Sequence, residues 1–272
     1  FADLRTHYHA VGLAIGAEMP RALPIPGHEL TGIHFAMDYL IEQNRAISGE
    51  SADTLRANTN ANANANVNTN TRATTTTTTI DACGKNVIII GGGDTGSDCL
   101  GTALRQKARS VHQFEIMPMP PSERSPQTPW PQWPLQLRSS HAHEEGGKRV
   151  WSISAKRFIG EQGRVTKLIA ERVELVNGSF RKVAGDASEI AYDADLVILA
   201  MGFTGPQEGP LLSDLSLKRD ARGNVATNAD HMTSEPGVFA AGDVRRGASL
   251  IVWAIAEGRR MAAAMHRFAT QT

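Results

Sequence analysis

The sequence is poor in cysteine, and this absence excludes several kinds of site. Only Cys83 and Cys99 occur in 272 residues, too few for a disulfide framework, a Cys-rich metal site or an iron–sulfur cluster. The two residues also lack the close spacing of a redox-active dithiol. We therefore expect a reducing, cytoplasmic compartment and no thiol–disulfide chemistry within the chain.

The sequence also lacks an excess of charge of either sign and lacks long apolar runs. The 28 Lys and Arg residues equal the 28 Asp and Glu residues, so the net charge favours neither nucleic acid nor a membrane surface as a partner. The longest apolar runs, 196–201 and 250–255, are far shorter than the roughly 20 residues of a membrane span. The chain begins with Phe1 and no leader-like segment follows, so we expect it to be part of a larger polypeptide.

Large apolar residues are almost absent from one internal segment. The tract 56–79 consists mainly of Asn, Ala and Thr, with a single Val, and cannot bury enough surface to offset its own ordering entropy. A partner-binding or aggregation-prone element is conceivable, but a solvated surface insertion is the simpler interpretation. The tract therefore marks a boundary, not a site.

A β-α-β unit follows, with glycines at its first turn. The pattern predicts a strand over 86–90, a helix over 94–108 and a strand over 110–116. Between the first strand and the helix stands G-x-G-x-x-G, made of Gly91, Gly92, Gly93, Asp94, Thr95 and Gly96. The first glycine permits the tight turn, the second lets the backbone approach a diphosphate, and the third lets helix and strand pack closely. With a helix N-terminus facing the phosphates, the unit predicts a dinucleotide site.

Glu115 ends the second strand of this unit, about 20 residues after the glycines. A carboxylate there accepts hydrogen bonds from both hydroxyls of the adenine ribose and repels the 2′-phosphate of NADPH. At about 4 Å the repulsion is about 1 kcal/mol per charge pair in water and about 4 kcal/mol near a protein surface. NADH is therefore favoured, but Arg124 in the next loop is able to neutralise the phosphate or Glu115, which leaves NADPH open.

The remaining chain predicts an antiparallel meander, a buried strand and a closing helix. Strands are expected over 150–159 and 165–175, and the run 193–203 contains a buried strand that ends at a glycine, much as 9–17 does. Short strands at 223–228 and 237–243 precede the helix from about residue 250. At the end of the second short strand, Gly242 and Asp243 form either a common helix-capping turn or a second nucleotide feature. In a flavoprotein, the helix N–H groups near Leu250, Ile251 and Ala254 would stabilise charge on a reduced flavin.

Several motifs together resemble the small (beta) subunit of glutamate synthase. The resemblance covers nearly the whole chain outside the Asn/Thr tract, and the last two motifs are the most specific. The matching motifs, in order, are GGGDTGSDC, FEIMPMPP, PWPQWP, HEEG, LAMGFTGP and VFAAGDVRRGASLIVWAIAEGR.

This resemblance implies an α/β fold with two three-layer, Rossmann-like domains. The NAD(P)H-binding domain, which contains the antiparallel meander, would be inserted into an FAD-binding domain. The implied division is 1–49 for a partial FAD domain, 50–80 for the insertion, 81–203 for the NAD(P)H domain and 204–272 for the FAD domain's return. Gly16 and Gly202 would then follow the returning strands of the two domains. Gly242, Asp243 and the start of the last helix carry over to FAD, and Gly91 to Gly96 with Glu115 carry over to NAD(P)H.

The family's activity would follow from these cofactors. Its members pass hydride from NAD(P)H to FAD and electrons through iron–sulfur clusters to a large (alpha) subunit, which forms glutamate from glutamine and 2-oxoglutarate. No protein acid or base is needed for the hydride step, so we name no catalytic residue. The FAD fingerprint and the cluster cysteines would lie upstream of Phe1. A related pyrimidine-reductase-like or electron-bifurcating flavoprotein, or a non-catalytic dinucleotide-binding module, are the alternatives.

Three further candidates have simpler explanations. The segment 141–147 lacks the i, i+4 histidine pair of zinc helices and is interpreted as a loop or helix start, so we predict no metal site. Trp130 and Trp133, in a proline-rich loop that could serve as a lid, are expected to pack within that loop in preference to stacking on the coenzyme. The pair Arg245 and Arg246 is predicted either to contact FAD or the large subunit, or to lie in a solvated turn.

Overall fold

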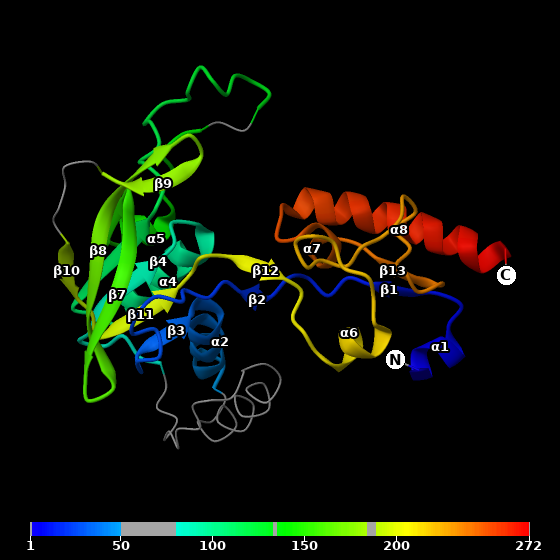
Figure 1. Ribbon diagram of the computed structural model, residues 1–272, viewed down its shortest axis with the longest axis horizontal. Helices are drawn as coiled ribbons and strands as arrows, with labels where there is room; N and C mark the ends of the chain where they lie inside the picture. The colour runs from blue at the N-terminus through cyan, green and yellow to red at the C-terminus, as the bar shows by residue number, and fades with distance from the viewer. Residues whose placement is uncertain (1, 50–79, 133–134, 184–188, 272) are drawn as a thin grey trace. The chain divides into compact units, whose positions relative to one another are not determined.

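The computed structural model describes residues 2–49, 80–132, 135–183 and 189–271 (Figure 1). The described residues form two compact units. The first contains residues 2–21 and 202–271, and the second contains 22–49 and 80–201 with the gaps given above. The chain therefore starts in the first unit, builds the second and returns to the first. The Asn/Thr tract and Trp133 lie outside the described residues.

The boundary after the first segment differs from the one expected at residue 49. β3 (Ile33–Phe35) pairs in parallel with β11 (Leu196–Leu199) of the second unit. The helix that follows, α2 (Ala36–Ile47), buries Tyr39 completely in the core of the same unit. Residues 22–49 therefore belong with the β-α-β unit, and the structural boundary lies near residue 21. Which cofactor each unit binds stays a prediction.

A five-stranded parallel sheet is the centre of the second unit, in the order β3-β11-β4-β5-β6. β4 (Asn86–Ile90), α4 (Asp94–Arg105) and β5 (Ser110–Glu115) form the predicted β-α-β unit, and β6 (Lys148–Trp151) follows the short helix α5 (His141–Glu144). On one face, helices α2 and α4 cover the sheet. The core there contains Tyr39, Val87, Ile89, Cys99, Leu100, Ala103 and Ile198.

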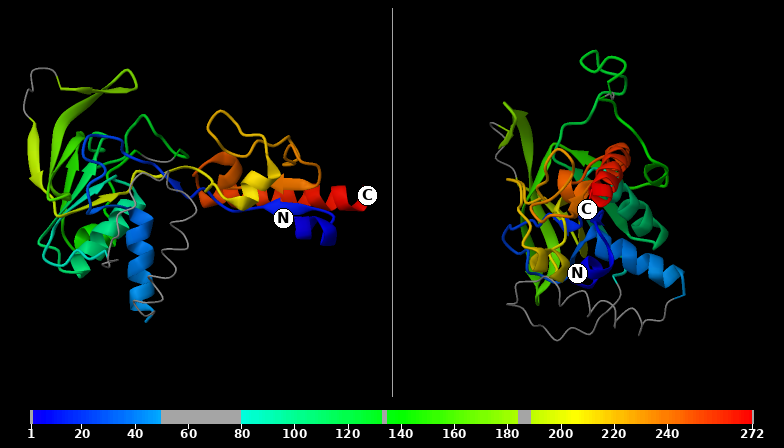
Figure 2. Two further views of the ribbon diagram at one scale, coloured as in Figure 1. Left: turned by 60° about the horizontal axis from the view of Figure 1, so that its bottom comes forward. Right: turned by 90° about the vertical axis from the view of Figure 1, so that its right-hand side faces the viewer.

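The other face of this sheet is covered by antiparallel strands, which Figures 1 and 2 show as a long ribbon beside it. β7 (Ile153–Glu161) pairs with β8 (Arg164–Val176), and β8 also pairs with β9 (Ser179–Lys182) and β10 (Ile190–Asp193). The core between the two layers contains Ile88, Phe114, Phe158, Leu168, Val197 and Leu199. Helices, parallel sheet and antiparallel sheet make three layers, and the predicted meander is confirmed.

The first unit is built on two parallel strands and the closing helix. β1 (Val11–Leu13) pairs with β13 (Val238–Ala240), and α8 (Ile251–Gln271) packs against β1. The expected strand at 223–228 is reduced to an isolated bridge between Arg219 and Val225. The other elements are α1 (Ala2–His7), β2 (Met19–Pro20), β12 (Phe203–Gly205), α6 (Pro210–Leu215) and α7 (Asp243–Arg246). None of the described helices has the length and apolar character that a membrane span requires.

Candidate functional site

The turn between β4 and α4 has a geometry that only glycine satisfies at two positions. Gly91 has φ 131°, and a Cβ added to it would lie 2.1 Å from the carbonyl oxygen of Ala200. A Cβ on Gly96 would lie 2.2 Å from the carbonyl oxygen of Gly91, so the first turn of α4 rests directly on the end of β4. The first and third glycines of the pattern therefore set the turn and the close approach of helix to strand.

Gly93 differs from these two glycines because it faces open space. A Cβ added there would meet no atom within 4 Å, and its φ of −80° and ψ of −176° are allowed for any residue. Gly93 is the N-cap of α4, and no side chain caps the helix. The N-terminal N–H groups, with the positive end of the helix dipole, are available to an anion that approaches Gly93.

Glu115 lies beside this turn, at the end of β5. Its Oε1 accepts a hydrogen bond of 2.8 Å from the backbone N–H of Met117, and its Oε2 would lie 2.1 Å from a Cβ on Gly92. Arg124 does not neutralise it among the described contacts: the guanidinium donates to the Thr128 carbonyl within its own loop, over 3.1 Å. The sequence-predicted acid and glycine turn are therefore brought together, whereas Arg124 is bonded elsewhere.

Trp130, in the same loop, does not pack as expected. Its side chain is 84% exposed, so the prediction that this tryptophan is buried against its own proline-rich loop is wrong. Stacking on a coenzyme stays a prediction.

Sequence reasoning missed a buried polar network below the glycine turn. Gln113 on β5 is 2% exposed, and its Nε2 donates to the Gly91 carbonyl over 2.9 Å. Its Oε1 lies 2.8 Å from Nε2 of His143 in α5, and the same nitrogen lies 3.3 Å from the Ser97 hydroxyl of α4. Ser140 forms a capping box with His143. The available signals were a glutamine inside an apolar strand and a serine three residues before a histidine.

A second turn, in the first unit, carries Gly242 and Asp243. Gly242 has φ 75°, and its N–H donates to Glu257 Oε2 over 3.0 Å. Glu257 is 1% exposed, and its Oε1 accepts from Arg245 at 2.9 Å and from Arg246 at 2.7 Å. The two arginines are therefore held by a buried carboxylate while their side chains stay 29% and 33% exposed, and their contact with FAD or a large subunit stays a prediction. Sequence reasoning missed Glu257 because a charge on a helix usually marks its solvent face.

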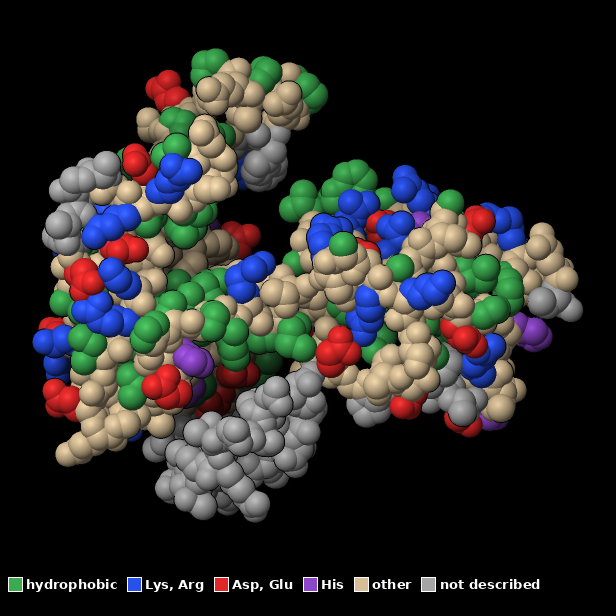
Figure 3. All heavy atoms as spheres, in the orientation of Figure 1, with side chains coloured by type: hydrophobic (Ala, Val, Ile, Leu, Met, Phe, Trp, Pro, Cys, Tyr) green, Lys and Arg blue, Asp and Glu red, His purple; other side chains and the backbone are tan. Residues whose placement is uncertain are grey.

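Asp243 lies next to the N-terminus of α8. Its Oδ1 accepts a 3.1 Å hydrogen bond from the Ser249 hydroxyl, and a Cβ on Gly242 would contact Ala254 at 3.6 Å. Leu250 and Ile251, where the helix begins, are 66% and 75% exposed, and Figure 3 shows hydrophobic side chains on the surface of this unit. Gly242, Asp243 and Ala254 thus come together, with an uncovered apolar surface beside them.

Gly16 and Gly202 occupy matching places in the chain. Each stands three residues after a parallel strand, β1 or β11, and they have φ 73° and 79°. A Cβ on either would meet nothing within 4 Å, so backbone conformation and not space requires glycine there. The repetition expected from the two similar sequence segments is present in the backbone.

The two cysteines do not form a redox pair. Both are free, with Cys83 exposed and Cys99 buried in the core. Burial, with the nearby charge of Asp98 second, raises the pKa of the Cys99 thiol to about 12, so it stays protonated.

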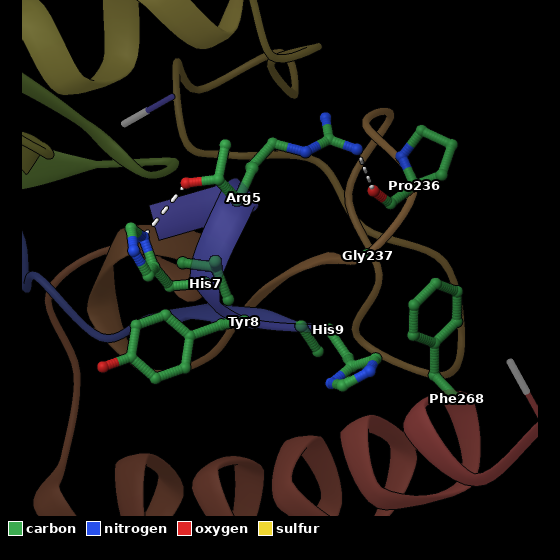
Figure 4. Close-up of a pocket in the computed structure, with 10 residues that line it drawn as sticks. Arg5, His7, Tyr8, His9, Pro236, Gly237 and Phe268 are labelled. Carbon is green, nitrogen blue, oxygen red and sulfur yellow. Dashed lines mark hydrogen bonds between the residues drawn. The ribbon is translucent and has the colours of Figure 1, made fainter. Parts of the chain in front are cut away.

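The first unit also contains a pocket of about 390 Å³. Figure 4 shows residues that line it. His7, Tyr8, His9 and Phe268 line it, together with Arg5, which pairs with Glu235 and donates to the Pro236 carbonyl. None of the predicted site residues lines this cavity.

Comparison with known proteins agrees with this geometry. The sequence profile of the pyridine nucleotide-disulphide oxidoreductases matches residues 3–258. The glutamate synthase [NADPH] small chain of Mycobacterium tuberculosis is 52% identical over 265 residues, which cover 97% of this chain and 50% of that protein. Glutamate synthase [NADH] of Saccharomyces cerevisiae is 39% identical over 280 residues, 98% of this chain and 12% of that protein. The resemblance noted in the sequence is thereby confirmed, and the chain spans about half the length of the small chain it matches.

Solved structures show the same fold at low identity. FprA of Mycobacterium tuberculosis, determined in complex with NADPH, has 14% identity and a TM-score of 0.69, over 99% of this chain and 66% of that one. Thioredoxin reductase of Lactococcus lactis has 15% identity and a TM-score of 0.57, over 97% of this chain and 67% of that one. The predicted α/β fold class is confirmed.

Proposed function

The chain belongs to the pyridine nucleotide-disulphide oxidoreductase family, and from this premise we propose that it oxidises NAD(P)H for a flavin within a glutamate synthase. The observation that carries the proposal is the open N-terminus of α4 at Gly93, with Glu115 beside the same turn. The glycine turn binds the diphosphate of the coenzyme through backbone N–H groups, and the helix dipole stabilises its charge. The chain's contribution is binding and orientation, since the hydride step requires no protein acid or base.

We propose further that NADH is preferred over NADPH. The Glu115 carboxylate is anchored on the Met117 N–H and adjoins Gly92, so it is positioned to accept from ribose hydroxyls and to repel a 2′-phosphate. Arg124, expected from the sequence as able to reverse this preference, donates to the Thr128 carbonyl. The names of similar proteins include both coenzymes, so the preference rests on these contacts alone.

The first unit would hold one part of FAD, which when bound accepts the hydride and passes electrons onward. Asp243 offers a carboxylate to a ribityl or ribose hydroxyl, and the first turn of α8 offers N–H groups and an apolar surface. The fit supports the assignment of Gly242, Asp243, Leu250, Ile251 and Ala254. We propose that the remainder of the FAD site and the iron–sulfur clusters lie in sequence outside these 272 residues.

Anaerobic stopped-flow reduction of the full-length protein tests the electron-entry role. Bound flavin should lose its oxidised absorbance on mixing with NADH, faster than with NADPH at equal, subsaturating concentration. Equal rates would remove the NADH preference and leave the role intact. If neither coenzyme reduces the flavin, the proposed function is wrong.

The glutamate synthase assignment requires a second test, because a related flavoprotein reductase would pass the first. We propose a large subunit, or a fused equivalent, as the electron acceptor that forms glutamate from glutamine and 2-oxoglutarate in the cytoplasm. NADH oxidation should depend on both substrates when the two parts are purified together. Coenzyme oxidation that is unaffected by glutamine and 2-oxoglutarate would favour the alternative reductase.

A further inference from the structure

The buried amide of Gln113 fixes the direction of every hydrogen bond around it. A carbonyl oxygen only accepts, so the bond to Gly91 requires that the amide NH₂ of Gln113 faces the glycine turn. The amide oxygen of Gln113 therefore faces His143, which must donate from Nε2. At the other side of the imidazole, Nδ1 accepts from the Ser140 backbone N–H over 3.1 Å. The network thus assigns His143 as the neutral Nε2–H tautomer.

This network holds two peptide groups of the turn. Gln113 binds the Gly91 carbonyl, and Ser97 donates to the Gly93 carbonyl from its hydroxyl at 3.3 Å and its backbone N–H at 3.0 Å. In a planar trans peptide the N–H points opposite to the C=O. The N–H groups of Gly92 and Asp94 are therefore turned away from the anchors.

We propose that Gln113 and His143 are positioning residues, which hold the glycine turn so that its N–H groups face the diphosphate of the coenzyme. The inference rests on the proposed function, because it takes Gly91 to Gly96 as the coenzyme site. Gly91 benefits from such an anchor: with φ 131° and no side chain its backbone is free to turn, its N–H is held by the Phe114 carbonyl over 2.9 Å, and Gln113 holds its carbonyl. His143 acts through Gln113 and touches neither coenzyme nor reacting atoms.

Protonation of His143 would weaken the network. An imidazolium carries N–H on both nitrogens, so Nδ1 could no longer accept from the Ser140 backbone N–H and would keep only the Ser140 hydroxyl, 3.0 Å away, as an acceptor. The charged and titratable groups on the elements around it are Asp94, Asp98 and Arg105 of α4, His112 and Glu115 of β5, Lys148 and Arg149 of β6, and His141 and Glu144 of α5 itself; Arg105 pairs with Glu145. Burial, with the charge of Arg149 second, lowers the pKa of His143 below 6.5. Coenzyme affinity should therefore be constant above about pH 6.5 and fall as the pH drops through the lowered value.

Two substitutions and a matched control test the proposal by coenzyme titration of the full-length protein. Gln113→Met keeps the side-chain length but removes both hydrogen bonds, and His143→Asn keeps an acceptor for Ser140 but does not reach Gln113. Each should raise the Kd of NADH about tenfold. His141→Asn makes the same change two residues earlier, on a fully exposed side chain, and should leave the Kd unchanged. The His143→Asn protein should also lose the acid-dependent rise in Kd that the unaltered protein shows.

The tautomer of His143 can be measured in the protein with an unaltered binding site, which gives a second test of the network. In ¹⁵N-labelled protein, the imidazole signal of His143, identified by its loss in His143→Asn, should have the pattern of a neutral ring protonated at Nε2. A ring protonated at Nδ1 would overturn the proposal. So would folded Gln113→Met and His143→Asn proteins with unchanged Kd and unchanged pH dependence. If the unaltered protein binds no coenzyme at all, the proposed function fails instead, and the tautomer measurement still tests the network.

Discussion

Substitution of Gly93 by alanine separates the coenzyme site from the fold. A Cβ there would meet no atom within 4 Å, and the backbone of Gly93 is allowed for alanine. Alanine is a poorer N-cap than glycine, but it also lowers the entropy of the unfolded chain, so the free energy of unfolding should change by less than about 1 kcal/mol. The methyl group would instead occupy the space through which a diphosphate reaches the N–H groups of α4.

The loss in coenzyme affinity follows from hydrogen-bond geometry. A methyl group keeps the phosphate oxygens beyond about 3.2 Å from the N–H groups behind it, where such bonds weaken steeply. Loss of one or two charge-assisted bonds, at about 1.5 kcal/mol each, corresponds to a tenfold to hundredfold rise in Kd, as orders of magnitude.

Gly96→Ala is the comparison variant, because the same change there should lower the free energy of unfolding. Its Cβ would lie 2.2 Å from the Gly91 carbonyl oxygen and 2.6 Å from Nε2 of Gln113, so α4 must move away from β4. Overpacking of this kind costs about 1–3 kcal/mol, offset in part by about 1 kcal/mol from the better helix propensity of alanine. Urea unfolding and fluorescence titration with NADH measure both quantities. Unchanged NADH affinity in Gly93→Ala would refute the assignment of this turn to the coenzyme.

Three further predictions concern other parts of the molecule. Glu115→Gln should reduce the preference for NADH over NADPH by about tenfold or more, measured as a ratio of kcat/KM values, and an unchanged ratio would show that Glu115 does not set it. Glu257→Ala should lower the free energy of unfolding by about 3 kcal/mol, because it removes the buried partner of Arg245, Arg246 and the Gly242 N–H, whereas Glu257→Gln should cost less. Thermal unfolding of both variants checks this, and equal effects would contradict the role of the charge. Burial, followed by the charge of Lys85, lowers the pKa of His34 from 6.5 to about 4. The stabilisation by the neutral imidazole is therefore fully present above pH 6.5. The free energy of unfolding should fall by at most about 3 kcal/mol as the pH drops from 6.5 toward 4. Urea unfolding between these pH values should show a smaller loss of unfolding free energy in His34→Gln than in the unaltered protein. Equal pH dependence in the two proteins would contradict this role of His34.

Local sequence patterns were sufficient where neighbouring residues determine the structure. The glycine pattern, the strand before it and the helix after it are adjacent, and Gly91 and Gly96 have the close contacts that the pattern predicts. The place of Glu115 beside the glycine turn likewise follows from its position at the end of the next strand, about 20 residues after the glycines. The compact unit begins near residue 22 and not after residue 49, because β3 has only three residues and joins the sheet by pairing with β11, more than 160 positions later.

The missed side chains depend on the same long-range pairing. Gln113 and Glu257 stand in apolar strand and helix patterns, and only the folded chain places Gly91 or Gly242 against them. The segment 141–147 gives no sign of this network beyond a histidine among polar residues, and only in the folded chain do the ring nitrogens of His143 contact Gln113, Ser97 and Ser140. A polar residue within an apolar pattern was the signal available for Gln113 and Glu257, and a serine three residues before a histidine was the signal for His143.

The most direct measurement of the central claim is amide hydrogen exchange of the full-length protein with and without NADH. Backbone N–H groups that bind the diphosphate exchange slowly while the coenzyme is bound. We predict that protection on adding NADH is centred on residues 91–97, the glycine turn and the first turn of α4. Saturating NADH that protects other segments and leaves these amides unchanged would contradict the account.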